Sequence, residues 1–208
     1  VSQLSNDNIF DENFFLDERN LGCFLDLEID YIICVHYPFI IPKSILDMPK
    51  IGVLNLHPAY LPYNKGWHTS TWAILDNTAC GGTLHFMSEI LDGGDIIHQK
   101  KIKVSHCDTA NTLYKRILDL EFEVFTESFN SIMSLNPNRI KQSNNGSVHR
   151  KNDLFEINEL DLRDNINVED FLNKLRALTT NEIKEAAYFK KDGSKYAVQV
   201  KIKKINEE

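Results

Sequence analysis

The sequence predicts an α/β fold with a largely parallel β-sheet flanked by helices, followed by a small C-terminal helix and β-hairpin. Two short apolar runs rich in β-branched residues, 31–35 and 52–57, are typical of strands in such a sheet. Residues 110–135 carry apolar side chains at helical spacing. Residues 185–205 place an Asp-Gly pair between two partly alternating runs, which is a strong hairpin signal.

The first part of the chain is expected to supply one strand and one short helix. Residues 1–20 are polar with interspersed phenylalanines and predict a loop or a short helix. The uninterrupted apolar run Tyr31–Val35 predicts a strand that is buried on both faces. Ser44 is expected to cap a short helix over 45–48, which Pro49 ends.

The middle of the chain is expected to supply three strands and one helix. The run 52–57 predicts the second strand, and a helix over 70–75 should keep Trp72 on its buried side. Two further strands are expected over 83–87 and 95–100, joined by a loop that contains Gly-Gly.

The last part of the chain begins with the long helix, 110–135, for which Asp108 or Thr109 is the expected N-cap. An Asn-Pro pair ends this helix. Residues 141–152 are polar and predict a linker, and a helix over 168–178 follows it.

We divide the chain into a main domain, 1–140, and a C-terminal part, 141–208, that holds the linker, helix and hairpin. A lone hairpin is too small to be stable in water. It should therefore pack on the main domain or across a homodimer, and we favour the homodimer.

Composition limits the possible partners and the cellular location. The chain has 208 residues and a net charge of −7, without a basic block, which argues against nucleic-acid binding. No apolar run approaches the roughly 20 residues that span a bilayer, and the start does not resemble a signal peptide. The cysteines show no zinc-site spacing, so we expect reduced thiols, no metal and a cytoplasmic protein. These cysteines are Cys23, Cys34, Cys80 and Cys107.

The residues best suited to chemistry are Asn55, His57 and Asp92. Asn55 and His57 are two positions apart on a predicted strand, so their side chains share one face. An Asn amide can donate to a developing oxyanion, and an imidazole supported by a carboxylate can move a proton, as acyl transfer to an amine requires. Taken singly, the first two could cap a strand, and Asp92 before Gly-Gly could be a turn residue.

The joint pattern resembles the folate-dependent formyltransferase family. Asn55-Leu56-His57-Pro58 and, further on, Leu91-Asp92-Gly93-Gly94 match its Asn-x-His-Pro and Leu-Asp-x-Gly arrangement. The resemblance covers roughly residues 30–104 and implies a Rossmann-like formyltransferase core with Asn55, His57 and Asp92 as the catalytic triad. It also implies 10-formyltetrahydrofolate as cosubstrate and a primary amine as acceptor.

Within this family the sugar N-formyltransferases look most similar, because Asn64 to His68 and the C-terminal segments resemble theirs. That likeness implies a dTDP-linked 4-amino-4,6-dideoxyhexose as acceptor, with a product for surface polysaccharide such as O-antigen. Other acceptors, methionyl-tRNA or a 3-amino sugar nucleotide, stay open. So do an inactive folate or nucleotide-sugar binding module and a purely structural oligomerisation protein.

The resemblance also implies binding residues. The loops that match the family's pterin contacts supply the candidates Pro38, Phe39, Ile40, Met87, Glu89 and Leu91. Without the family match, the first loop would be a hydrophobic plug over the sheet end. The candidates for the sugar nucleotide are Lys65, Trp67 and His68. Trp67 packing on the next helix and a solvated Lys65 are the alternatives.

One departure concerns the N-terminal part. Family members begin with a strand, a glycine-bearing loop and a helix, and no Gly-x-Gly precedes Tyr31 here. Either the enzyme is abridged, or the chain lacks this N-terminal strand-loop-helix unit, which would hold part of the nucleotide site. The start at Val1, without a Met, favours the second.

Overall fold

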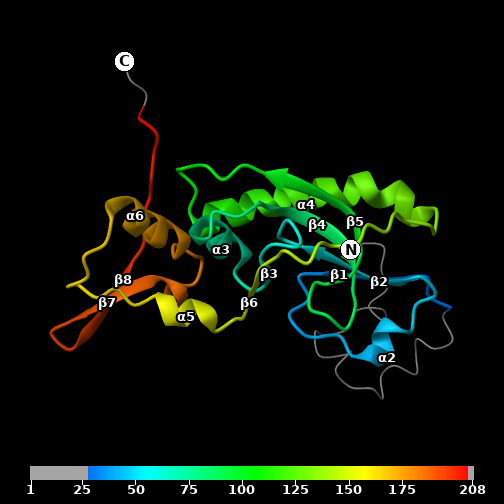
Figure 1. Cartoon of the computed structure of the whole chain (residues 1–208), viewed down its shortest axis with the longest axis horizontal. Helices are drawn as coiled ribbons and strands as arrows, with labels where there is room; N and C mark the ends of the chain where they lie inside the picture. Colours follow the sequence, from blue (N-terminus) through cyan, green and yellow to red (C-terminus); the bar gives the residue numbers. More distant parts are fainter. Residues whose placement is uncertain (1–27, 206–208) are drawn as a thin grey trace, which may run out of the picture.

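The computed structural model describes residues 28–205, so the prediction for residues 1–20 lies outside the described range. The main sheet has four strands in the order β1-β2-β4-β5, and two small two-stranded sheets accompany it (Figure 1). The strands are β1 Tyr31–Val35, β2 Gly52–His57, β3 Lys65–Gly66, β4 Cys80–Phe86, β5 Ile96–Ile102, β6 Val148–His149, β7 Ala187–Lys191 and β8 Ser194–Val198. The helices are α2 Lys43–Leu46, α3 Thr69–Leu75, α4 Ala110–Met133, α5 Asp153–Ile157 and α6 Val168–Ala177, with a 3₁₀ turn at Ile183–Glu185.

The prediction of a largely parallel sheet is wrong, because the main sheet is mixed. Strand β1 pairs parallel with β2, whereas β4 runs antiparallel to both β2 and β5. The short loop from Phe86 to Ile96 contains no crossover helix, so it can join only antiparallel neighbours. Helix α3 lies beyond the end of the sheet and packs against α4 and α6, so the chain re-enters the sheet as β4 in the reverse direction (Figure 1).

Helix α4 covers one face of the sheet and closes the main core. Leu54, Leu84 and Phe86 of the sheet pack with Val124 and Ile132 of α4. The predicted N-cap is confirmed at Thr109, whose side chain accepts from the Thr112 N–H in a capping box. No helix in the described part of the chain is both long and apolar enough to cross a membrane.

Two details at the start of the described chain differ from prediction. Strand β1 is not buried on both faces: Ile33 is 42% exposed and Val35 58%. The physical reason is its position at the edge of the main sheet, where it pairs only with β2 among the described strands. Helix α2 begins at Lys43 after Pro42 and has no side-chain cap, so the proposed Ser44 cap is wrong.

The three cysteines within the described residues form no disulfide. Cys34, Cys80 and Cys107 are free thiols, and Cys23 lies outside the described residues. Burial raises the pKa of Cys34 to about 11 and that of Cys80 to about 12, which keeps both protonated. No group of three or more His, Cys, Asp or Glu residues within 28–205 is placed to hold a metal ion.

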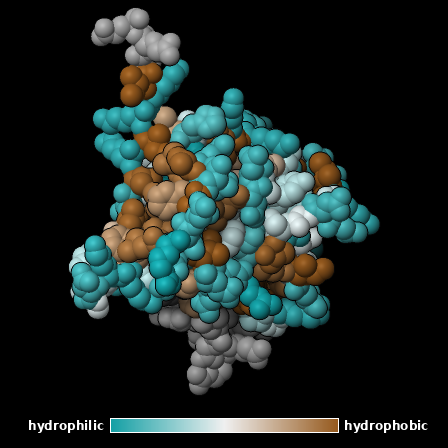
Figure 2. Space-filling view, turned by 60° about the vertical axis from the view of Figure 1, so that its left-hand side comes forward, coloured by the Kyte–Doolittle hydropathy of each residue, from teal (hydrophilic) through white to brown (hydrophobic). Residues whose placement is uncertain are grey.

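The C-terminal part forms a second small core. Leu154 of α5, Leu175 of α6 and Ala187 of β7 pack together there. The predicted hairpin is confirmed, and Asp192 and Gly193 at its turn have the positive φ values, 50° and 77°, that a tight hairpin needs. Figure 2 turns this side of the molecule forward and shows apolar side chains gathered among polar ones. Exposed apolar residues of this part include Phe155, Leu162, Ile166, Val168, Leu172, Ile183 and Tyr196.

Candidate functional site

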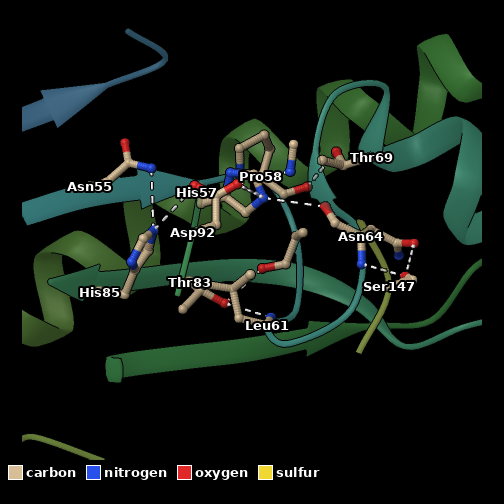
Figure 3. Close-up of polar contacts among 12 residues, drawn as sticks. Asn55, His57, Pro58, Leu61, Asn64, Thr69, Thr83, His85, Asp92 and Ser147 are labelled. Carbon is tan, nitrogen blue, oxygen red and sulfur yellow. Dashed lines mark hydrogen bonds and ion pairs between the residues drawn. The ribbon is translucent and has the colours of Figure 1, made fainter. Parts of the chain in front are cut away.

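Strands β2 and β4 bring Asn55 and His85 face to face. The two residues are direct partners in the antiparallel register, and Asn55 Nδ2 lies 3.3 Å from His85 Nε2 (Figure 3). His85 Nδ1 lies 2.8 Å from the Phe86 carbonyl oxygen, which can only accept. The proton of the neutral ring therefore sits on Nδ1, and Nε2 accepts from the Asn55 amide. This contact fixes the amide orientation and leaves its second N–H for another acceptor.

His85 stays neutral because it is buried completely in the sheet. Desolvation is the main cause that lowers its pKa to about 4, and the neighbouring His57 acts in the same direction. The two imidazole rings meet edge to face with centroids 6.2 Å apart. A neutral His85 therefore serves as a permanent acceptor beside Asn55 near neutral pH.

Asp92 completes the polar cluster from the loop after β4. Its Oδ2 accepts a hydrogen bond from the Gly66 N–H at 2.8 Å and lies 3.6 Å from His57 Nε2. Its Oδ1 lies 3.8 Å from His85 Nε2. Asp92 has φ +46°, a left-handed conformation that non-glycine residues rarely adopt. The surrounding structure must therefore hold this residue in place.

His57 Nε2 faces oxygen acceptors. Besides Asp92, the Asn64 carbonyl oxygen lies 3.3 Å from it. A proton at Nε2 is favoured by both acceptors, which leaves Nδ1 as the basic nitrogen of the ring. The imidazole is 6% exposed, so this contact set operates largely out of water.

The turn after His57 is held by a buried polar network. Asn64, 1% exposed and at φ +57°, donates from its side chain to Thr78 and from its backbone to Ser147. Thr83 of β4 donates to the Ala59 carbonyl at 2.7 Å (Figure 3). These bonds fix the path of the chain and so the direction of the Asn64 carbonyl.

The two loops proposed for the pterin lie side by side. Lys43, just beyond the first loop, forms an ion pair with Glu89 of the second at 2.6 Å. Met87 packs against the cluster that contains Ile41. Ile40 is 85% exposed, and Leu91 is also exposed. Pro38 is exposed and Phe39 is partly covered.

The residues proposed for the sugar nucleotide flank Gly66, whose N–H donates to Asp92. Lys65 and Gly66 form β3, and Trp67 and His68 continue from it. Trp67 is 37% exposed, and the Lys151 ammonium lies 4.5 Å from its ring centre. His68 Nε2 lies 3.3 Å from the Lys151 carbonyl oxygen. These side chains therefore line the border between the main domain and the segment that leads to α5.

Sequence reasoning missed three residues that support the cluster: His85, Asn64 and Gln142. The signal for His85 was its register opposite Asn55, which can be used only once β2 and β4 are known to pair. Gln142 lies in the predicted linker, yet its amide nitrogen donates to the Asp92 and Gly94 carbonyls at 2.8 and 2.7 Å. No local sequence pattern predicts a contact between residues about 50 positions apart.

The assembled groups suit acyl transfer to an amine. A positioned amide N–H can bind a developing oxyanion, and the imidazole beside a carboxylate can take a proton from the attacking nitrogen. The three residues that the sequence predicted to act together, Asn55, His57 and Asp92, are brought together by the fold (Figure 3).

Comparison with known proteins gives two family matches and close structural relatives. Residues 2–129 match the family described as formyl transferase, and residues 153–204 match the N-formyltransferase dimerization C-terminal domain. The chain is 30% identical over 171 residues to dTDP-4-amino-4,6-dideoxyglucose formyltransferase of Mycobacterium tuberculosis, covering 82% of this chain and 72% of that protein.

Solved structures agree. A 4-N formyltransferase from Francisella tularensis superposes with a TM-score of 0.83 at 28% identity, over 91% of this chain and 77% of that one. A formyltransferase from Anoxybacillus kamchatkensis, in complex with UDP-4,6-dideoxy-4-formamido-L-AltNAc and tetrahydrofolate, gives a TM-score of 0.61 at 31% identity, over 70% of this chain and 77% of that one. The family match over more than half of the chain and the likeness to these enzymes lead to one conclusion: this chain belongs to the formyltransferase family.

Proposed function

We propose that the protein transfers a formyl group from 10-formyltetrahydrofolate to the amine of a dTDP-linked 4-amino-4,6-dideoxyhexose. The observation that carries this proposal is the convergence of Asn55, His57 and Asp92 at the β2 and β4 strands. The name of the Mycobacterium tuberculosis relative, which is similar over 82% of this chain, supports this class of sugar.

The residues divide the reaction between charge stabilisation and proton transfer. The acceptor nitrogen attacks the formyl carbon, and a new C–N bond forms as the carbonyl oxygen takes up negative charge. The free N–H of Asn55 donates to this oxyanion, in the orientation that His85 imposes. His57 accepts the proton lost by the amine at Nδ1, while Asp92 stabilises the resulting cation.

The second half of the reaction returns that proton. When the oxyanion collapses, the bond from the formyl carbon to N10 of the folate breaks. N10 carries the departing electron pair and takes a proton from His57, directly or through water. The products are the formamide and tetrahydrofolate, and His57 is neutral again, so protons and charge balance.

The loops that contain Phe39 and Met87 are proposed to bind the pterin. Their neighbouring position and partly exposed apolar side chains suit a flat heterocycle. The presence of tetrahydrofolate in the Anoxybacillus kamchatkensis structure supports a folate ligand. Lys65, Trp67 and His68 are proposed to contact the nucleotide-linked sugar. They lie on and directly after β3, whose Gly66 N–H donates to Asp92, so they extend outward from the proposed catalytic residues.

The C-terminal part is proposed to form a homodimer. Residues 153–204 match a domain described as a dimerization domain, and the hairpin exposes apolar side chains such as Tyr196. The net charge of −7 argues against methionyl-tRNA as acceptor.

The proposal is tested by mass spectrometry of products. The protein is incubated with 10-formyltetrahydrofolate and a panel of dTDP- and UDP-linked 3-amino and 4-amino sugars. Gain of one formyl group on a dTDP-4-amino sugar supports the proposal. Gain on another acceptor corrects the substrate, whereas binding without transfer would identify a binding module instead of an enzyme.

Replacing His57 by Asn tests the proposed chemistry. We expect His57→Asn to lower turnover by about 10³-fold or more, because the amide cannot take up the amine proton. His98→Asn, on β5 and outside the cluster, is the matched control and should keep wild-type turnover. Near-normal turnover in folded His57→Asn would remove His57 from the mechanism.

A further inference from the structure

The segment after α4 crosses the candidate site before it reaches the C-terminal part. We call residues 140–149 the strap. At its start, Ile140 exchanges two backbone hydrogen bonds with Ile96 at the beginning of β5. At its end, the carbonyls of Ser147 and His149 accept from the Lys65 and Trp67 N–H groups. The strap is therefore bound to both sides of the polar cluster and is not a free linker.

Gln142 is the strap residue that reaches the loop carrying Asp92. Its Nε2 donates to the carbonyl oxygens of Asp92, at 2.8 Å, and Gly94, at 2.7 Å. Only the nitrogen of the amide can donate, so the two carbonyls dictate how the side chain is turned. Its Oε1 is buried without a hydrogen-bond partner among the described residues.

The loop needs this support because its conformation is unusual. Asp92 lies at φ +46°, and Gly94 passes so close to β4 that an added Cβ would stand 1.9 Å from the Phe86 carbonyl oxygen. The two bonds from Gln142 hold the peptide that follows Asp92 and the peptide that follows Gly94. A shift of this loop would move the Asp92 carboxylate, which stands 3.6 Å from His57, away from the imidazole.

We propose that Gln142 is a positioning residue for Asp92, acting from the strap through the backbone of the loop. The proposal rests on the proposed function in one respect, that Asp92 supports His57 during formyl transfer. It assigns a role to a residue outside both family matches, which end at residue 129 and resume at 153.

The kinetic test combines two variants of Gln142 with Asp92→Asn. Gln142→Ala removes the side chain, and Gln142→Met keeps its bulk without donors. Both should lower kcat by about 10- to 100-fold, with the KM for the amino sugar changed less than about threefold, since a small displacement of a catalytic group has that scale of effect. In the Asp92→Asn background the same substitutions should cost less than about threefold, because the group they position has lost its charge.

The control is Gln199→Ala, which removes a glutamine that also donates to a carbonyl, that of Thr180, on the exposed C-terminal part. It should keep wild-type kinetics. Equal losses in the wild-type and Asp92→Asn backgrounds, or full activity of Gln142→Met, would overturn the proposal. A drop in both kcat and stability with equal costs in the two backgrounds would mark Gln142 as structural only.

Hydrogen exchange separates this proposal from the proposed function. In Gln142→Met, a peptide covering residues 88–96 should exchange at least about tenfold faster than in the wild type, while a β7–β8 peptide exchanges as before. Unchanged exchange over 88–96 refutes the positioning role even if the wild type is active. Faster exchange in a protein that formylates none of the sugars would keep the contact and refute the proposed reaction.

Discussion

His85 should make the stability of this protein depend on pH in a defined direction. In the folded protein, burial lowers the pKa of His85 to about 4, whereas an ordinary histidine has a pKa of 6.5. Between these values the unfolded chain binds more protons than the folded one, so the free energy of unfolding rises with pH. The contribution of His85 to the free energy of unfolding is fully present above pH 6.5 and is lost as the pH falls toward 4.

The magnitude follows from the two pKa values. At about 1.36 kcal/mol for each pH unit between them, the full loss is about 3 kcal/mol, of which about 2 kcal/mol is lost by pH 5. The main cause is burial, which penalises the charged imidazolium. A proton on His85 Nε2 would also face the Asn55 Nδ2 donor, 3.3 Å away.

The assay is urea unfolding of the wild type and of His85→Gln at pH 7.5 and pH 5.0. Ionisable groups away from this cluster are shared by both proteins, so the difference between the two pH dependences reports on the site of His85. The wild type should lose about 2 kcal/mol more than the variant, with unchanged m-values. Parallel losses in the two proteins would refute the assignment of a neutral, proton-resistant His85.

Two further predictions concern packing. Leu113→Ala should lower the free energy of unfolding by about 2–5 kcal/mol in urea denaturation, because this α4 side chain is fully buried against α3. Leu118→Ala, on the exposed side of α4, should cost less than about 1 kcal/mol. Gly94→Ala should lower turnover in the mass-spectrometric assay by at least about tenfold, because its Cβ cannot fit beside the Phe86 carbonyl without moving the Asp92 loop; wild-type turnover would show that the loop tolerates the shift.

Strand and helix positions were largely readable from the sequence where local signals agree. Strands β1 and β2 span the predicted residues, and Thr109 caps α4 as expected. Strand β4 starts at Cys80, whereas the predicted strand began only at residue 83. Glycines such as Gly81 and Gly82 weaken the sequence signal for a strand. In the structure they allow close approach, since an added Cβ on Gly81 would stand 2.0 Å from the Lys100 carbonyl oxygen.

The direction of strands and the partners of side chains could not be read in the same way. The apolar character of Ile33 and Val35 predicted burial, but exposure depends on which strand lies alongside. Asn55, His57 and Asp92 were proposed together because the motif names them. Their supports, His85 and Gln142, depend on a register and on a contact 50 positions along the chain. Helix α5, which is only five residues long, was not predicted.

The strap also limits how this protein can be divided or recombined. The family matches leave residues 130–152 unassigned between them, which makes that stretch look like a neutral crossover point for chimaeras. A fragment ending with α4 would retain Asn55, His57 and Asp92. It would lose Gln142, which donates to the Asp92 loop, and Ser147, which accepts from the Asn64 N–H. The two parts therefore match separate family models, but their structures depend on each other through the strap. An active chimaera must keep the strap together with the part that contains β2 and β4.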